Sequence, residues 1–497
     1  MLTRRVLQAI TCWAWLGLAL LASSCGSPAT GGGDGATSDT SGAAQGDAGL
    51  AAQGDAGLAA QGDAGGGSPG DAGLSGDGPT GGTRKDGGAT QKDSGATRSD
   101  SGAAQRDSGA TQRDSGGPGP VGPSAVDTSC GSGTLLKVPS VHKTIGAALT
   151  AAKEGDTILV EPGAYAIGTL TIAKKRITLT SSYCSTKNAA DVEAVKLTGK
   201  VVFAAKTADG GRLLGVTVLE PNGKDTIQPR AAGTQILFNR LIAANDVVAL
   251  DGQAGPVVIH GNYIKSNGGD DNIDIDGMFD VTIENNTLDT AAQDGIEMRF
   301  HPGITKLQTV IIRGNVIKDP KQDAIQFMDG YGADPKLRKI RIERNVLLRT
   351  GTAGVGMNHQ SDSSQSYLGE PIKEEIVVLN NSFIECGAGI SGGANALVGN
   401  NLFKGIKTRA LWKVTGTSQV VSNLFFSNAK DQEQSTLDPT KNLVGRDPLL
   451  GADFTLGAAS PAIDAGKSSF SFGGQTLSVT SGFQKGAAPD LGALEKQ

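Results

Sequence analysis

The feature that most constrains the fold is a short phrase that recurs eight times between residues 239 and 425: asparagine, a variable residue and an apolar residue. The eight asparagines are Asn239, Asn262, Asn286, Asn315, Asn345, Asn381, Asn401 and Asn423. Seven to nine residues later, most copies continue with Asp-x-Ile-x-apolar, as at Asp271 and Asp294. Short β-branched runs lie between the halves, and the repeat period is about 20 to 36 residues. The pattern predicts a solenoid whose coils are short strands joined by bends.

Stacked coils of this kind bring equivalent residues together every ~4.8 Å along the axis, around an apolar core. An asparagine at the same bend of every coil can hydrogen-bond its neighbours above and below. The repeat resembles the right-handed parallel β-helix of the pectin-lyase-like superfamily over residues 133–495. The resemblance implies an all-β fold. It does not fix a reaction, because this scaffold carries lyases, hydrolases, epimerases and inert adhesins.

Both ends of the solenoid are expected to be covered. Residues 144–156 have helical periodicity and lead directly into the strand-like run 157–165, an arrangement similar to the opening of many exported β-helix proteins. There the helix plugs the open end of the solenoid. The tail after Phe425 resembles a closing segment of such proteins, and we assign it a capping role.

The N-terminal quarter has a different composition. Residues 1–24 have the charged and apolar regions of a signal peptide, and the following Cys25 lies in a sequence that resembles a bacterial lipobox. Residues 25–125 are Gly, Ala, Ser, Asp and Gln in short repeats, which predicts a disordered tether before the β-helix domain at 126–497. We expect an exported monomer held by a lipid at the outer membrane or cell surface, or else secreted.

Cysteine content and charge exclude some functions. Cys130 and Cys184 are able to pair in an oxidising compartment, whereas Cys386 is expected to be a buried small hydrophobe. The cysteine and histidine spacing does not suggest zinc. A net charge of −5 without basic clusters argues against nucleic acid as a partner.

Coil length predicts where a groove lies. The step between asparagines grows from 23 residues to 36 and then falls to 20 and 22. The extra residues follow the Asp-x-Ile strand each time, in 299–308, 328–339 and 358–374, so they should stack into a wall. Strand alternation points Ile273, Ile275, Ile296, Met298, Ile325 and Phe327 inward. The side chains expected to face the groove are Asn272, Asp274, Asp276, Glu297, Arg299, Gln326 and Asn358.

Acidic residues gather on neighbouring coils of that groove. Their oxygen atoms suit calcium, which takes six to eight such ligands. The set is similar to polysaccharide lyases of family nine, with Asp246 on one coil and Asp270-Asp271-x-x-Asp274 on the next. The resemblance implies that these four residues hold calcium. It also implies that the metal neutralises a uronate carboxylate while a base removes the neighbouring proton in a β-elimination.

The base is where the resemblance breaks, because Glu297 stands where the family has lysine. Arg299 and Lys265 are the other candidates. An acidic polysaccharide would be bound by groups of the groove and its wall, where Phe300 and tyrosines also offer rings for sugars to stack on. These substrate-binding candidates are Asp276, Gln326, Asn358, Tyr331 and His301.

Two alternatives stay open. Asn245-Asp246 and Gly269-Asp270-Asp271 resemble the paired acids of polygalacturonases, although the Gly-His-Gly coil of that family is missing. The second alternative is a non-catalytic surface or adhesion module whose acids are solvated or structural. For Asp294 and Asp323 we favour a structural role, the capping of backbone N–H groups at bends.

Overall fold

The computed structural model describes residues 126–496 except 224, 253–254, 278–279, 302–303, 329–336, 359–368 and 480–481. The predicted signal peptide, Cys25, the tether and Tyr331 lie outside the described residues. No helix in the described part of the chain is long and apolar enough to cross a membrane.

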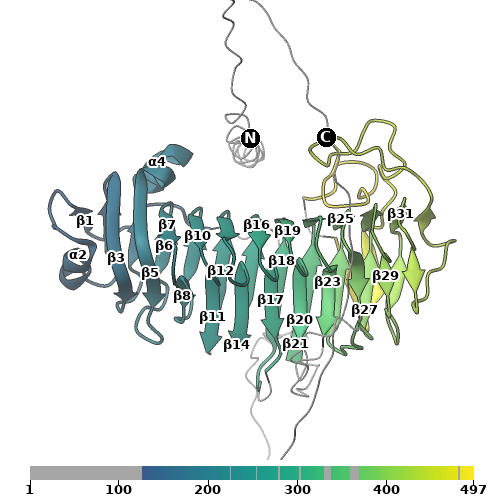
Figure 1. Ribbon diagram of the computed structural model, residues 1–497, viewed down its shortest axis with the longest axis horizontal. Coiled ribbons are helices and arrows are strands. Elements are labelled where there is room, and N and C mark those ends of the chain that lie inside the picture. The colour runs from purple at the N-terminus through teal and green to yellow at the C-terminus, as the bar shows by residue number, and fades with distance from the viewer. Residues whose placement is uncertain are drawn as a thin grey trace, which may run out of the picture. The chain divides into compact units, whose positions relative to one another are not determined.

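The described residues wind into a parallel β-helix whose coils each contribute up to three short strands, which confirms the predicted all-β solenoid (Figure 1). We call the three stacks of strands A, B and C. Stack A has twelve strands. They are β1 (Leu135–Val138), β2 (Thr157–Val160), β4 (Thr178–Thr180), β6 (Arg212–Leu214), β9 (Gln235–Leu237), β12 (Val257–His260), β15 (Val281–Glu284), β18 (Gln308–Arg313), β21 (Arg338–Glu343), β24 (Glu375–Leu379), β27 (Ala396–Gly399) and β30 (Gln419–Val421).

Stack B follows the asparagine of each coil. Its strands are β7 (Thr217–Glu220), β10 (Arg240–Ala243), β13 (Tyr263–Ser266), β16 (Thr287–Ala291), β19 (Val316–Pro320), β22 (Val346–Leu348), β25 (Ser382–Ile384), β28 (Leu402–Lys404), β31 (Leu424–Phe426) and β33 (Leu443–Val444).

Stack C follows the second bend. Its strands are β8 (Ile227–Pro229), β11 (Val248–Gly252), β14 (Ile273–Gly277), β17 (Ile296–Arg299), β20 (Ile325–Met328), β23 (Ala353–Asn358), β26 (Ala388–Ser391), β29 (Leu411–Trp412) and β32 (Gln432–Glu433). Two longer strands, β3 (Gly163–Ile172) and β5 (Val195–Phe203), begin stacks B and C together, because β5 pairs with β7 and then with β8.

The asparagine row forms a continuous hydrogen-bonded ladder at the bend between stacks A and B. In Asn286, for example, the backbone N and Nδ2 donate to Asn315 Oδ1 at 2.9 and 3.0 Å, and Nδ2 also donates to the carbonyl of Ile259 at 2.8 Å. The residue before each asparagine has positive φ, as at Phe238 (53°). The row continues to Asn442, a ninth copy beyond the eight identified in the sequence.

Inside the solenoid the apolar residues form one continuous core. The third residue of the asparagine phrase points into it, and three such phenylalanines stack: the Phe383 and Phe403 ring centroids lie 4.6 Å apart, and those of Phe403 and Phe425 lie 4.9 Å apart. Identical residues in successive coils therefore stabilise one another by direct stacking as well as by burial.

A short helix, α2 (Ile145–Ala151), lies at the N-terminal end beside β1 and β3 (Figure 1). Thr144 caps it by accepting a hydrogen bond from the Ala147 N–H at 3.1 Å. Ile145 and Ala148 are buried in the core. This is the position that the sequence predicts for a plugging helix.

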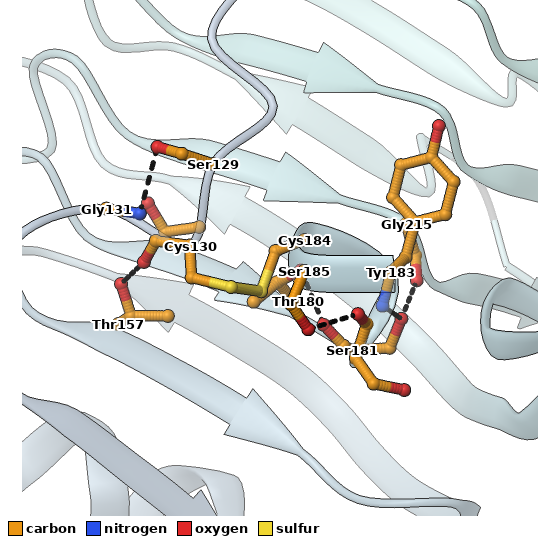
Figure 2. The surroundings of a disulfide bond; sticks show 12 residues. Ser129, Cys130, Gly131, Thr157, Thr180, Ser181, Tyr183, Cys184, Ser185 and Gly215 are labelled. Atoms are coloured by element: carbon orange, nitrogen blue, oxygen red, sulfur yellow. Dashed lines mark hydrogen bonds between the residues drawn. A yellow bond between two sulfur atoms is a disulfide. The ribbon is translucent and has the colours of Figure 1, made fainter. Parts of the chain in front are cut away.

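A disulfide joins Cys130 to Cys184, so the pairing that the sequence allowed is present (Figure 2). It ties the segment before β1 to α3 (Tyr183–Thr186), which is followed by α4 (Ala189–Ala194). Tyr183 is buried beside it and contacts Phe238, with ring centroids 5.6 Å apart. Cys386 is buried and unpaired by disulfide, as expected.

The C-terminal tail covers a side of the solenoid rather than only its end. The hairpin of β34 (Ser469–Phe472) and β35 (Gln475–Ser478) places Phe470 and Phe472 on Val377 and Leu397, on the outer face of stack A. Residues 456–494 likewise contact outward side chains of stack B, including Leu402 and Leu424. The expected capping role is thus extended to a lateral cover.

Candidate functional site

The outer face of stack C brings the predicted groove residues of neighbouring coils into one row. Strand register pairs Asp274 with Glu297, then Glu297 with Gln326 and Gln326 with Gly356. The predicted alternation is confirmed, because every residue assigned to the inner face is buried in the core. These residues are Ile273, Ile275, Ile296, Met298, Ile325 and Phe327.

A second ladder, made of aspartates, runs along the bend before stack C. Asp246 Oδ1 accepts a hydrogen bond from the Asp271 N–H at 3.1 Å, and Asp271 Oδ1 accepts from the Asp294 N–H at 2.7 Å. The ladder continues when Asp294 Oδ1 accepts from the Asp323 N–H at 2.6 Å, and Asp323 Oδ1 from the Ala353 N–H at 2.6 Å. Asp294 and Asp323 therefore have the structural role that we predicted. Asp246 and Asp271 belong to the same ladder, with one oxygen of each engaged in it.

All four predicted metal ligands lie together. Carboxylate oxygens of Asp246, Asp270 and Asp271 are within 4.8 Å of one another, and so are those of Asp271, Asp274 and Glu297. The two groups share Asp271. Asp270 and Asp274 are partly exposed, whereas Asp271 and Glu297 are 2% and 1% exposed. The cluster therefore combines buried acids with acids that solvent can reach.

Burial makes these carboxylates poor anions on their own. Desolvation, reinforced by the charge of Asp270, raises the pKa of Asp246 to about 6. Desolvation also raises the pKa of Asp274 to about 8 and that of Glu297 to about 7, although Arg299 opposes both shifts. The pKa of Asp271 is well above its usual range for the same reason. Such a site must hold protons or a cation near neutral pH.

The donor set fits a hard divalent cation such as calcium. Every group is a carboxylate, and calcium binds oxygen ligands in flexible geometry. Asp274 Oδ1 is buried and makes no hydrogen bond among the described residues, so it can accept a metal bond without losing a hydrogen bond. Asp246, Asp270, Asp271 and Asp274 would hold the ion, and Glu297 lies beside Asp271 and Asp274 in the second group, on the face that alternation predicts for it.

Arg299 is surrounded by acids. Its Nη2 pairs with Glu297 Oε1, and its Nη1 lies 3.7 Å from Asp274 Oδ1 and 3.7 Å from Asp276 Oδ2. Burial alone would lower the pKa of Arg299, but the carboxylates of Glu297, Asp274 and Asp276 raise it above its ordinary value. A guanidinium in this position stays protonated and balances the acids. That environment does not suit a base.

Lys265 lies on a different stack. It is in β13 of stack B, in register with Ile242, and its side chain is half-buried. Among the described residues, no ion pair joins it to the acids of stack C.

The candidate substrate-binding residues divide by exposure. Asp276 and His301 are partly exposed and contact each other, with His301 Nε2 2.5 Å from Asp276 Oδ1. Gln326 is fully buried, and its Nε2 lies 3.5 Å from Asp323 Oδ2. Asn358 is 2% exposed, and its Nδ2 has no hydrogen-bond partner within the described residues.

Phe300 is a correction. We expected it to offer a ring to a sugar, but it is 0% exposed and stacks on Phe327, with ring centroids 5.7 Å apart. Strand alternation continues directly after β17, so Phe300 follows Ile296 and Met298 into the core instead of facing the wall.

A buried ion pair that the sequence did not reveal connects the three insertions. Arg338 Nη1 lies 3.1 Å from Glu374 Oε1, and both side chains are 1% exposed. Arg338 also donates to the His301 carbonyl and lies over the Phe300 ring, 4.7 Å from its centroid. The only sequence signal is a charged residue at the loop-to-strand junction of two successive coils, which is too common to be specific.

Comparisons with known proteins identify the fold. A family model described as "Right handed beta helix region" matches residues 245–425. With the strand topology above, this match shows a right-handed parallel β-helix. A search of curated proteins found no match.

Solved structures similar to this chain include pectate lyase Pel9A, at 17% identity and a TM-score of 0.36 over 74% of this chain and 97% of that one. The PL6 family alginate lyase AlyGC is 12% identical, with a TM-score of 0.38 over 66% of this chain and 56% of that one. A pectin methylesterase from Aspergillus niger is 13% identical, with a TM-score of 0.26 over 62% and 93%.

Proposed function

We propose that this protein binds an acidic polysaccharide on the outer face of stack C through a calcium ion held by Asp246, Asp270, Asp271 and Asp274. The observation that carries the proposal is the convergence of these carboxylates within 4.8 Å, in two groups that share Asp271. Buried acids of this kind gain from a divalent cation. A uronate carboxylate of the polymer would complete the coordination from the open side.

Cleavage by β-elimination is the enzymatic form of this proposal. A bound calcium ion would neutralise the uronate carboxylate and acidify the neighbouring C–H. A base then takes that proton, and the electron pair of the C–H bond forms a carbon–carbon double bond. The C–O bond to the next sugar breaks, and the leaving oxygen keeps its electrons and takes a proton from water. Of the three candidates, Glu297, with a pKa of about 7, is best suited to move a proton near neutral pH. Arg299 would orient the acids, and Asp276 with His301 would contact the sugar.

A non-catalytic surface module is the second candidate, and the environment of Arg299 favours it. The guanidinium already balances Glu297, Asp274 and Asp276, and the aspartate ladder occupies one oxygen each of Asp246 and Asp271. In this form the acids would only hold the ligand.

The N-terminal sequence adds a proposal on location, an exported chain lipidated at Cys25. Palmitate labelling of wild type and Cys25→Ser would test it.

The thermal midpoint of the whole chain in EDTA and in millimolar calcium tests the metal site. Ligand binding to the native state stabilises it by ~2.7 kcal/mol at a free concentration of about 100 Kd. Asp270→Asn is the informative variant, because the carboxyl of Asp270 lies outside the aspartate ladder. It should abolish the calcium shift and leave the midpoint in EDTA near that of wild type.

The matched control is Asp319→Asn, which removes an acid that pairs with Arg349 on stack B. This variant should keep the full calcium shift. An equal shift in Asp270→Asn and wild type would contradict the proposed ligands. Incubation with polygalacturonate and calcium then separates the two candidates, because only a lyase releases an unsaturated, ultraviolet-absorbing product.

A further inference from the structure

The outer face of stack C carries a second polar cluster, far from the acids, around Trp412 in β29. Register places Trp412 after Ser391 and before Glu433 in the same row as Asp274 and Glu297. Five strand steps separate Asp274 from Trp412, which corresponds to ~24 Å along the axis. Between them the chain at Glu370 crosses the face, held by hydrogen bonds to Met357 and Gly393. The Trp412 cluster is thus a separate surface.

Cations surround this tryptophan. The Arg409 guanidinium carbon lies 3.8 Å from the ring centroid of Trp412, and Lys413 Nζ lies 4.8 Å from it. A guanidinium stacked on an indole is held in one orientation, so less conformational entropy is lost when it binds an anion.

The acid that pairs with Arg409 also serves a second cation. Arg409 makes one contact with Glu433, Nη1 to Oε2 at 2.8 Å, and Lys430 Nζ lies 3.5 Å from the same oxygen. Arg349 contrasts with this, because it makes a two-point pair with Asp319 at 2.7 and 2.6 Å. One carboxylate therefore serves two cations beside Trp412, and the guanidinium of Arg409 keeps capacity for a second anion.

The coils that carry the two clusters also differ in the sign of their charged residues. Residues 246–297 contain eleven acids and one lysine, whereas residues 404–446 contain seven lysines and arginines and three acids. The acidic coils need a cation to attract an anionic polymer. The basic coils attract it directly.

We propose that Arg409, positioned on Trp412, binds a carboxylate group of the same acidic polysaccharide without metal, about five coils from the calcium site. This inference rests on the proposed ligand class. It assigns a metal-independent, salt-sensitive contact to the basic end of stack C, which would keep the polymer on the protein when calcium is absent.

Binding of polygalacturonate oligomers to the full chain, measured calorimetrically in EDTA at low salt, tests the proposal. We expect wild type to bind with an affinity that falls at least tenfold in 0.5 M NaCl, and Arg409→Gln to lose at least fivefold at low salt. Trp412→Phe should weaken binding less. Trp412 is the one tryptophan outside positions 13 and 15, so the fluorescence difference between wild type and Trp412→Phe reports the contact directly.

The matched control is Arg176→Gln, an exposed arginine paired with Glu154 at 3.4 Å near the N-terminal end. It should bind like wild type, and an uncharged dextran should not bind at all. No binding in EDTA, or equal binding by Arg409→Gln and Arg176→Gln, would overturn the inference. Asp270→Asn distinguishes the two sites, because it should lose the calcium-dependent part of binding and keep the part that persists in EDTA.

Discussion

At the scale of single residues, the bend aspartates combine two roles. Asp246 and Asp271 each give one oxygen to the backbone N–H of the next coil, so the second oxygen of each is outside the ladder. In Asp246 that second oxygen accepts a hydrogen bond from Asn245 Nδ2 at 3.3 Å and keeps a lone pair for a ligand. Asp270 and Asp274 have no place in this ladder and are partly exposed. A ligand site can thus grow on a structural row when neighbouring positions add carboxylates. The cost is a set of buried acids with raised pKa values.

The raised pKa values predict a pH dependence of stability without metal. Asp246, Glu297 and Asp274 have pKa values of about 6, 7 and 8 in the folded chain, above their usual values of 3.8 and 4.5. The folded state therefore keeps protons that the unfolded chain releases. The stabilisation that these three protonated carboxyls contribute is complete below about pH 4 and is lost as the pH rises to about 8. Glu284, whose pKa is lowered to about 2, acts in the opposite direction only below that window.

Calorimetric midpoints at pH 5 and pH 8 in EDTA would measure this fall. Calcium should remove most of it, because the cation replaces the protons. Asp274→Asn should reduce it, whereas Asp319→Asn should not. A midpoint higher at pH 8 than at pH 5 in EDTA would show that these carboxylates are ionised in the folded protein.

At the scale of elements, the asparagine ladder defines the coil. Asn315→Ala should destabilise the chain by about 3 kcal/mol, because it leaves the Asn286 N–H and Nδ2 and the Ile283 carbonyl without their partner in a fully buried row. Urea unfolding would measure the loss. Asn222→Ala, at an exposed position, should change stability by less than about 0.5 kcal/mol. Equal effects would mean that the row is dispensable.

The repeat explains how much could be predicted from the sequence. Alternation and the asparagine phrase predicted the stacks, the inner face and the row that contains Asp274 and Glu297, because each follows from local periodicity. Contacts made by insertions follow no period. The Arg338–Glu374 pair and the contacts of Arg299 with its acids depend on side-chain positions that no period fixes, so the sequence could not reveal them. The burial of Phe300 was predictable, because it follows from alternation continued beyond Met298.

At the scale of the whole molecule, each coil contacts mainly the coils next to it, whereas the C-terminal tail contacts several coils. Asn380 Nδ2 donates to the Asp490 carbonyl at 2.9 Å, and Asn400 Nδ2 donates to the Lys467 carbonyl at 2.8 Å. The tail therefore covers the outward apolar side chains of the last coils. An uncovered apolar face there would be an aggregation hazard.

Phe470→Ala tests this cover. Phe470 is 5% exposed and packs on the outer face of stack A, so its truncation should cost about 3 kcal/mol and loosen the hairpin. Because coils contact only their neighbours, hydrogen exchange should accelerate in β24 and β27 and stay unchanged in β14 and β17. Calcium binding should also survive. Leu449→Ala, at a position 42% exposed, is the matched control and should leave exchange as in wild type. Unaltered exchange in β24 and β27 of Phe470→Ala would show that the tail adds no stability to the coils that it covers.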